Sequence, residues 1–270
     1  MERIQEALAK ARAQRQQGNA TQKKEVARPH NANPNTDAWE HLAPFKLNRA
    51  ALKRNRVVAA DSGPEAAPYD LMRTKIIHQC QINDWRRIAI VSPDAGAGKT
   101  TTLGNLAFSF ERQRDMRILC IDLDLRRPAL HTLLAQKPDH SMAEVLEGHV
   151  PFSQHGLRLG SRVALGLNNE PARNPSELLL SRVARDSLAA IEQEYAPDLT
   201  FFDISPLNGS DDNIAFLQNV DCAVIIAAAE STTMTRIDQA ERQVAELTNV
   251  MGIALNKCRY IGDADEYQYY

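Results

Sequence analysis

Short runs of apolar residues alternate along this chain with stretches whose apolar residues recur at helical spacing. Uninterrupted apolar runs are typical of strands buried on both faces of a parallel sheet. Segments built on such runs lie at 88–91, 117–128, 199–204, 220–229 and 250–255, with a weaker one at 163–167. Strands that alternate with helices predict an α/β fold, here a doubly wound, mainly parallel sheet with helices on both faces.

The helical stretches carry recognisable start signals. Pro68 opens a helix that runs through Ile77, because proline suits the first turn of a helix. Ser141 and Glu144 have the spacing of a capping box and predict a short helix. Longer helices are expected from Lys99 to Phe110, from Asn174 through Ile191 and over 232–247. Residues 41–64 are ambiguous, with 57–60 a possible edge strand.

The pattern divides the chain into four parts. Residues 1–15 place Ile4, Ala7, Leu8 and Ala11 on one narrow helical stripe, which predicts an amphipathic helix. Such a helix either folds back on its own domain or docks on another protein. Residues 16–40 are rich in Gln, Asn, Lys and Pro without periodicity, as in a disordered linker. One domain over 41–257 and a flexible tail over 258–270 complete the expected organisation.

Composition and charge argue against several classes of partner and site. The net charge is −2 and no basic face interleaved with aromatic residues stands out, which argues against a nucleic-acid partner. The longest uncharged apolar run, 222–229, is too short to cross a bilayer, and no signal segment is visible at Met1. We therefore expect a cytoplasmic protein with no direct membrane span. The scattered cysteines favour buried thiols at Cys120 and Cys222 over a disulfide or zinc site.

A glycine-rich segment between a strand and a helix carries the first chemical prediction. Pro93 to Thr100 reads GxxxxGK[ST] in all but its first position, where proline replaces glycine. In such a loop the backbone amides surround phosphate oxygens, the lysine meets the β- and γ-phosphates, and the first hydroxyl after it holds Mg²⁺. The residues predicted to bind nucleotide are Gly96, Ala97, Gly98, Lys99, Thr100 and Thr101.

Acidic residues end two other predicted strands. In an open parallel sheet, ligands bind beyond the carboxyl ends of the strands, so Asp122, Asp124 and Asp203 should meet the glycine loop. Asp203 has the position of an Mg²⁺-organising acid, and Asp122 and Asp124 alternate so that both point to one side. Arg126 either neutralises phosphate charge or pairs with these acids. A structural pairing of Asp122 and Asp124 with Arg126 or Arg127 is the alternative.

These segments together resemble the bacterial tyrosine kinase family, the autokinases of capsule and exopolysaccharide systems. The resemblance covers roughly 65–270 and rests on Ser92–Thr101, on Ile118–Pro128, on Phe201–Pro206, and on the stretches Asn174–Leu179 and Ala254–Lys257. It implies a P-loop fold that transfers the γ-phosphoryl group of ATP, with Mg²⁺, to tyrosines in a C-terminal cluster. Four of the six tyrosines lie in the last eleven residues: Tyr260, Tyr267, Tyr269 and Tyr270.

The residues and the resemblance together predict roles and partners. Lys99, Asp122, Asp124, Arg126 and Asp203 would be catalytic, with Asp122 as the base. Mg²⁺ would be held by Thr100, Asp124 and Asp203, and Asn256 would read the adenine edge. The implied partners are a membrane chain-length protein that activates the kinase and recruits it to the inner face of the plasma membrane, a cognate tyrosine phosphatase, and further copies of the chain for phosphorylation between chains.

Departures from the family keep alternatives open. The Glu-x-x-Arg-x-x-Arg helix of ring assembly aligns with Ala67, Asp70 and Arg73, so only its last position is retained. The main alternative is an ATPase switch of the ParA/MinD type, but such proteins carry an early lysine in the loop where this chain has Asp94. A third reading is a catalytically weak, ATP-binding adaptor of the polysaccharide machinery.

Overall fold

The computed structural model describes residues 36–208 and 211–258, and there helices and strands alternate much as the apolar pattern predicts. The strands are β1 (Ala43–Pro44), β2 (Arg87–Val91), β3 (Ile118–Leu123), β4 (Leu157–Leu159), β5 (Val163–Gly166), β6 (Leu199–Ile204), β7 (Cys222–Ala228) and β8 (Asn249–Asn256). The helices of eight or more residues are α4 (Ala67–Asn83), α5 (Lys99–Glu111), α10 (Arg182–Tyr195) and α12 (Met234–Leu247). The short α-helices are α2 (Thr36–His41), α3 (Arg49–Arg54), α6 (Leu130–Leu133), α7 (Met142–Leu146), α8 (Phe152–His155), α9 (Pro175–Leu180) and α11 (Asp212–Leu217), and two 3₁₀ turns are η2 (Val58–Ala60) and η3 (Pro64–Ala66).

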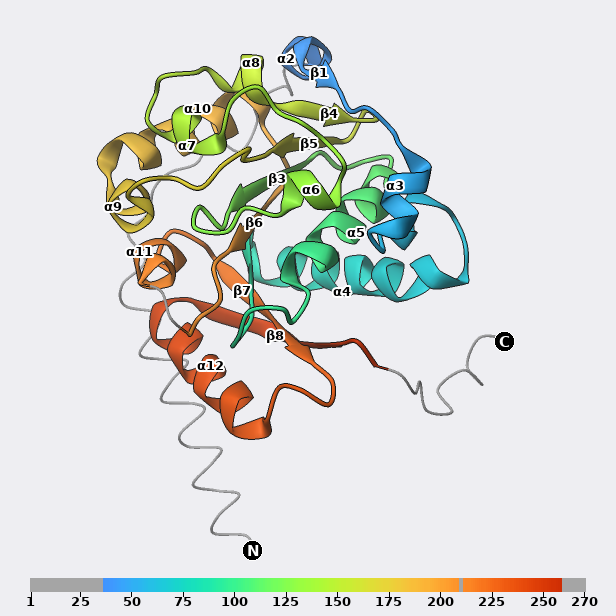
Figure 1. Cartoon of the computed structure of the whole chain (residues 1–270), viewed down its shortest axis with the longest axis vertical. Helices are drawn as coiled ribbons and strands as arrows, with labels where there is room; N and C mark the ends of the chain where they lie inside the picture. Colours follow the sequence, from blue (N-terminus) through green and yellow to red (C-terminus); the bar gives the residue numbers. More distant parts are fainter. Residues whose placement is uncertain (1–35, 209–210, 259–270) are drawn as a thin grey trace, which may run out of the picture. The chain divides into compact units, whose positions relative to one another are not determined.

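The described strands form one sheet in the order β1-β4-β5-β3-β6-β2-β7-β8. All neighbouring pairs are parallel except β4 with β5. β2 therefore lies between β6 and β7, near the middle of the sheet, where the continuous apolar runs of the sequence place it. Helices cover both faces (Figure 1), and the predicted doubly wound, mainly parallel architecture is confirmed.

Alternation along each strand divides the core between the two faces. Ile88 and Ile90 of β2 belong to the cluster that packs under α4 and α5. Ala89 and Val91 belong to the opposite cluster, together with residues of α7, α9, α10 and α11. Because both faces are covered, β2 has no exposed side chain over 88–91. The same parallel arrangement brings the carboxyl ends of β2, β3, β6, β7 and β8 to one edge of the sheet.

The expected linker over 16–40 is wrong for its last residues. Residues 36–40 lie in helix α2, and Trp39 is 2% exposed. The Trp39 indole Nε1 donates to the carbonyl oxygen of Tyr195 at 2.6 Å, and its ring lies 5.3 Å from the Arg117 guanidinium. One large aromatic residue thus anchors this segment to the domain. The lack of periodicity over 16–40 as a whole gave no sign of it. The predictions for 1–15, 16–35 and 259–270 lie outside the described residues.

Two further expectations are corrected. Residues 58–60 form the 3₁₀ turn η2 instead of an edge strand, and the edge beside β4 is taken by β1. The helix expected from Asn174 through Ile191 is broken at Ser181, whose backbone is extended and whose side chain accepts a hydrogen bond from the amide of Ala184. The chain changes direction at this residue, so α9 and α10 are two separate helices. The capping box of Ser141 and Glu144 is confirmed.

Among the described residues, no helix is long and apolar enough to span a membrane. Cys120 and Cys222 are free, buried thiols, as expected, and burial raises the pKa of each.

Candidate functional site

The glycine loop lies between the end of β2 and the start of α5. Gly96 and Gly98 have φ angles of +82° and +101°, in the left-handed region that glycine adopts without strain. Lys99 is the first residue of α5, and its side chain is buried. The first amides of α5 and the positive end of its dipole consequently face the loop, which is the arrangement that binds phosphate oxygens.

The acids at the ends of β3 and β6 meet beside this loop. Asp122 and Asp203 are aligned partners in the parallel register of the two strands, and both are 0% exposed. Asp124, one residue beyond β3, is 7% exposed and places Oδ2 at 4.0 Å from Nζ of Lys99. The structure thus brings together the lysine and the three carboxylates that the sequence predicts to converge.

Burial makes this cluster electrostatically unusual. Burial raises the pKa of Asp203 to about 6, and the positive charge of Lys99 only partly offsets that effect. Burial also raises the pKa of Asp122 well above its usual range, and the charges of Asp203 and Asp124 add to the rise. Shifts of this kind are typical of functional sites, where charge has been assembled in a desolvated place.

The two buried acids differ in their hydrogen bonds. Asp122 accepts from the backbone amides of Asp124 at 3.1 Å and of Leu130 at 3.4 Å, so its carboxylate also shapes the turn after β3. Both oxygens of Asp203 are buried and make no hydrogen bond of ordinary distance and angle among the residues that the structure describes, although the nearby hydroxyl of Thr100 lowers the pKa of Asp203. A buried carboxylate with so little compensation next to a phosphate loop fits a divalent cation as a further partner.

The surroundings of Asp203 suit Mg²⁺ in particular. Thr100, the second residue of α5, and Asp124 offer the further oxygen atoms. No group of three or more His, Cys, Asp or Glu side chains in the described part of the chain could hold a metal ion alone. Mg²⁺ commonly relies on one or two carboxylates and completes its shell with water and nucleotide phosphates. The residues therefore fit a nucleotide-bound Mg²⁺, which would neutralise phosphate charge.

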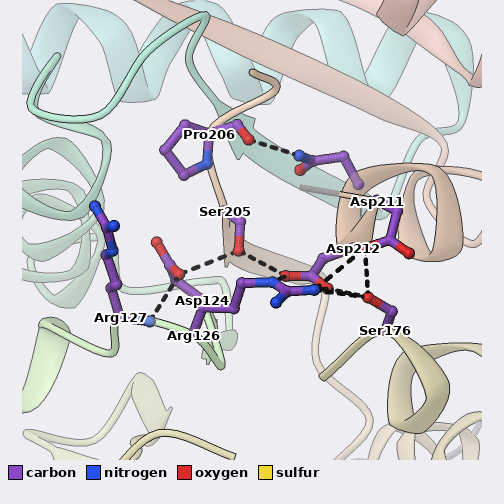
Figure 2. Close-up of polar contacts among 9 residues, drawn as sticks. Asp124, Arg126, Arg127, Ser176, Ser205, Pro206, Asp211 and Asp212 are labelled. Atoms are coloured by element: carbon purple, nitrogen blue, oxygen red, sulfur yellow. Dashed lines mark hydrogen bonds and ion pairs between the residues drawn. The ribbon is translucent and has the colours of Figure 1, made fainter. Parts of the chain in front are cut away.

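Arg126 points away from the acids of β3. Its Nε lies 2.7 Å from Oδ2 of Asp212 and its Nη2 lies 3.0 Å from Oδ1, and Nη2 also reaches Asp211 at 3.2 Å (Figure 2). The sequence offered pairing with Asp122 or Asp124 as one of two possibilities for this arginine. Arg126 pairs instead with Asp212, the first residue of α11. Sequence reasoning missed Asp212 because α11 follows no long apolar run.

The last strand ends against the glycine loop. Asn256 closes β8, and its Nδ2 donates to the carbonyl oxygen of Ala97 at 3.0 Å. The neighbouring Lys257 places Nζ at 2.7 Å from the carbonyl oxygen of Gly96. Asn256 thus lies beside the glycine loop, and its expected contact with the adenine edge stays a prediction. Lys257 was not anticipated, although its position directly after Asn256 was the available signal.

The residues at the positions that differ from the ParA/MinD loop and from the ring-assembly helix make contacts within their own chain. Asp94 pairs with Arg236 of α12 and accepts from Nδ2 of Asn208 at 3.0 Å, and these contacts lower the pKa of Asp94. On α4, Arg73 donates to the carbonyl oxygen of Ser109 at 2.6 Å, and Asp70 pairs with Arg112 of the same chain.

Comparison with known proteins agrees with this geometry. Residues 88–263 match the model of the CobQ/CobB/MinD/ParA nucleotide binding domain. The chain is 26% identical to the tyrosine-protein kinase YwqD of Bacillus subtilis, over 84% of this chain and 95% of that protein. It is 27% identical to the tyrosine-protein kinase Etk of Escherichia coli, over 73% of this chain but 27% of that longer protein.

A solved structure repeats the fold. The kinase domain of the Escherichia coli tyrosine kinase ETK matches with a TM-score of 0.67 at 21% identity, over 76% of this chain and 82% of that one. The glycine loop, the buried acids and the matched family model lead to one assignment. This chain belongs to the CobQ/CobB/MinD/ParA nucleotide-binding domain family of P-loop proteins, and within that family it resembles bacterial tyrosine-protein kinases.

Proposed function

We propose that the chain is an ATP- and Mg²⁺-dependent protein-tyrosine autokinase that phosphorylates its own C-terminal tyrosines. The observation that carries the proposal is the convergence of Lys99, Asp122 and Asp203 beside a phosphate loop. The names of YwqD and Etk supply the reaction class, and the tyrosines at 260, 267, 269 and 270 supply the acceptors.

The residues have separate roles in the proposed reaction. Gly96 to Thr101 bind the phosphates, and Lys99 neutralises the charge that develops on the γ-phosphoryl group. A tyrosine oxygen forms a bond to the γ-phosphorus while the bond from that phosphorus to the β–γ bridging oxygen breaks. The phenolic proton passes to the ionised carboxylate of Asp122, and ADP leaves. Thr100, Asp124 and Asp203 would hold Mg²⁺, which supplies charge neutralisation when it is bound.

The path of the chain supports the C-terminal tyrosines as acceptors. Asn256 and Lys257 both contact carbonyl oxygens of the glycine loop, so the tail begins at the site. The thirteen residues that follow Lys257 reach at most about 43–47 Å when fully extended. This length allows transfer within one chain or between chains, and the resemblance favours transfer between chains.

We also propose a membrane setting for the kinase. A membrane chain-length protein would activate it and hold it at the inner face of the plasma membrane, and a tyrosine phosphatase would reverse the modification. Ring assembly through α4 is disfavoured, since Asp70 and Arg73 contact residues of their own chain. Self-association for phosphorylation between chains would then use another surface.

The test is incubation of the full chain with γ-labelled ATP and Mg²⁺, followed by mapping of the label. We expect label on the tail tyrosines and its loss in Lys99→Met, with the exposed Lys53→Met as the matched control. Replacing all four tail tyrosines by phenylalanine should remove the label while ATP binding persists. ATP hydrolysis without labelled tyrosine would instead support the ParA/MinD-type switch, and ATP binding with neither reaction would support the adaptor.

The base and the metal ligand can be separated in the same assay. Asp122→Asn should lower the maximal transfer rate and leave its dependence on Mg²⁺ concentration unchanged. Asp124→Asn should shift that dependence to higher Mg²⁺ concentration. The reverse pattern would exchange the two roles.

A further inference from the structure

A polar network extends from Asp124 away from the phosphate loop, toward α9 and α11 (Figure 2). Its central residue is Ser205, directly after β6 and two positions beyond Asp203. The Ser205 hydroxyl lies 3.1 Å from Oδ1 of Asp124 and 3.2 Å from Oδ2 of Asp212. Ser205 is 2% exposed and Asp212 is 1% exposed, so these contacts are shielded from water.

The hydroxyl proton cannot serve both carboxylates at once. Asp212 already receives two hydrogen bonds from Arg126, at 2.7 Å and 3.0 Å, and its Oδ1 lies 2.5 Å from the hydroxyl of Ser176. A bidentate arginine satisfies a carboxylate strongly. Since Asp212 has these other donors, the proton of Ser205 is available to Asp124.

The same contacts secure the loop that carries Asp124. Arg126 follows Asp124 by two residues and anchors the loop to α11. The backbone amide of Arg127 donates to Oδ1 of Asp124 at 3.2 Å, on the same oxygen that Ser205 reaches. With Oδ1 held by two donors, Oδ2 is the oxygen that lies 4.0 Å from Nζ of Lys99.

We propose that Ser205 is a positioning residue that aims Asp124 at the nucleotide-bound cation, and that Arg126, held by Asp212, secures the loop that carries Asp124. The inference rests on the proposed function only in giving Asp124 a role toward Mg²⁺. It reassigns Arg126 from the catalytic group to the support of Asp124. Ser176 belongs to the same support, since its hydroxyl oxygen accepts from Nη2 of Arg126 at 3.0 Å and lies 2.5 Å from Oδ1 of Asp212.

The test measures nucleotide binding, so it does not depend on tyrosine phosphorylation. A fluorescent ATP analogue is titrated into the full chain with Mg²⁺ and, separately, with a chelator. Ser205→Ala should weaken the binding gained from Mg²⁺ about 10-fold, equivalent to about 1.4 kcal/mol, and leave metal-free binding unchanged. Ser205→Thr keeps the hydroxyl and should restore most of the gain. A purely structural role for Ser205 would weaken both forms of binding equally.

A double-mutant cycle tests whether the pair of Arg126 and Asp212 supports Asp124 separately from Ser205. Asp212→Asn should reduce the Mg²⁺-dependent gain because Arg126 loses its anchor, and its loss should add to that of Ser205→Ala because the two contacts reach Asp124 by separate routes. An unchanged Mg²⁺-dependent gain in Ser205→Ala would overturn the proposal, and an unchanged gain in Asp212→Asn would overturn the role of the pair. If thermal unfolding shows that Ser205→Ala is not folded, the same binding comparison is made with Arg126→Gln and Asp212→Asn, and Ser205→Thr is the control. Failure of the proposed function would be a different result: the unmodified chain would bind the ATP analogue with the normal Mg²⁺ dependence but would carry no label on tyrosine.

Discussion

Asp203 should make the nucleotide-free protein less stable than it would be with a neutral residue there. Burial raises the pKa of Asp203 from 3.8 to about 6, against the opposing charge of Lys99. The folded state therefore holds a proton more tightly than the unfolded chain does. The resulting penalty is absent below pH 3.8, grows as the pH rises, and is complete above about pH 6. At about 1.4 kcal/mol per pKa unit, it amounts to about 3 kcal/mol at pH 7.5.

The perturbation is Asp203→Asn, followed by urea unfolding without nucleotide or Mg²⁺. Fluorescence of the buried Trp39 reports the transition. At pH 7.5 the variant should gain up to about 3 kcal/mol in free energy of unfolding, less any cost of burying an asparagine amide. Removing the charge also relieves Asp122 of repulsion, which acts in the same direction. Asp238→Asn, on an exposed position of α12, is the matched control and should change little.

The difference between two pH values isolates the carboxylate, because the cost of the amide does not depend on pH. Between pH 7.5 and pH 5, the advantage of Asp203→Asn over the unmodified chain should shrink by about 1.4 kcal/mol. An advantage that stays constant over this range would refute the reasoning, as the side chain would then not be titrating with a raised pKa.

Three further predictions concern single positions. Gly98→Ala should abolish ATP binding in a fluorescence titration, because its φ is +101° and an added Cβ would lie 2.1 Å from Nδ2 of Asn256; retained affinity would contradict the loop geometry. Burial lowers the pKa of His155 to about 4 from 6.5, so protonation of the unfolded chain should cost about 2 kcal/mol of stability between pH 7.5 and pH 5. His155→Gln, followed by urea unfolding, should flatten that slope, and an unchanged slope would assign it to other groups. Ser181→Ala should lower the free energy of unfolding by about 1 kcal/mol through loss of the cap on α10, whereas Ser181→Asp should retain most of it.

Local signals in the chain were sufficient for much of the site. The run 88–91, the two loop glycines and Lys99 lie within a dozen residues, so their relation depends on short-range geometry that the motif itself specifies. Asp122 and Asp203 are far apart in sequence, but each follows an apolar strand. The rule that carboxyl ends of parallel strands share an edge was enough to predict their meeting.

Other contacts had no local signal. Trp39 lies in a polar segment of the sequence. It belongs to the core because it contacts Tyr195, which is distant in sequence. Arg126 could pair with several nearby acids, and its choice of Asp212 depends on where α11 begins after a loop without periodicity. The break at Ser181 is equally hidden, since serine is tolerated within helices and its use as a cap depends on how α9 and α10 pack.

The amino-acid sequence by itself determined the α/β class, the phosphate loop and the set of acids gathered at the edge of the sheet. These follow from hydrophobic periodicity and from the restricted backbone geometry of glycine, which act over a few residues. The tertiary structure decided how deeply each acid is buried, how Arg126 is engaged and how the last strand meets the loop. Those outcomes depend on desolvation and on distances between side chains remote in sequence, and both exist only once the chain has folded.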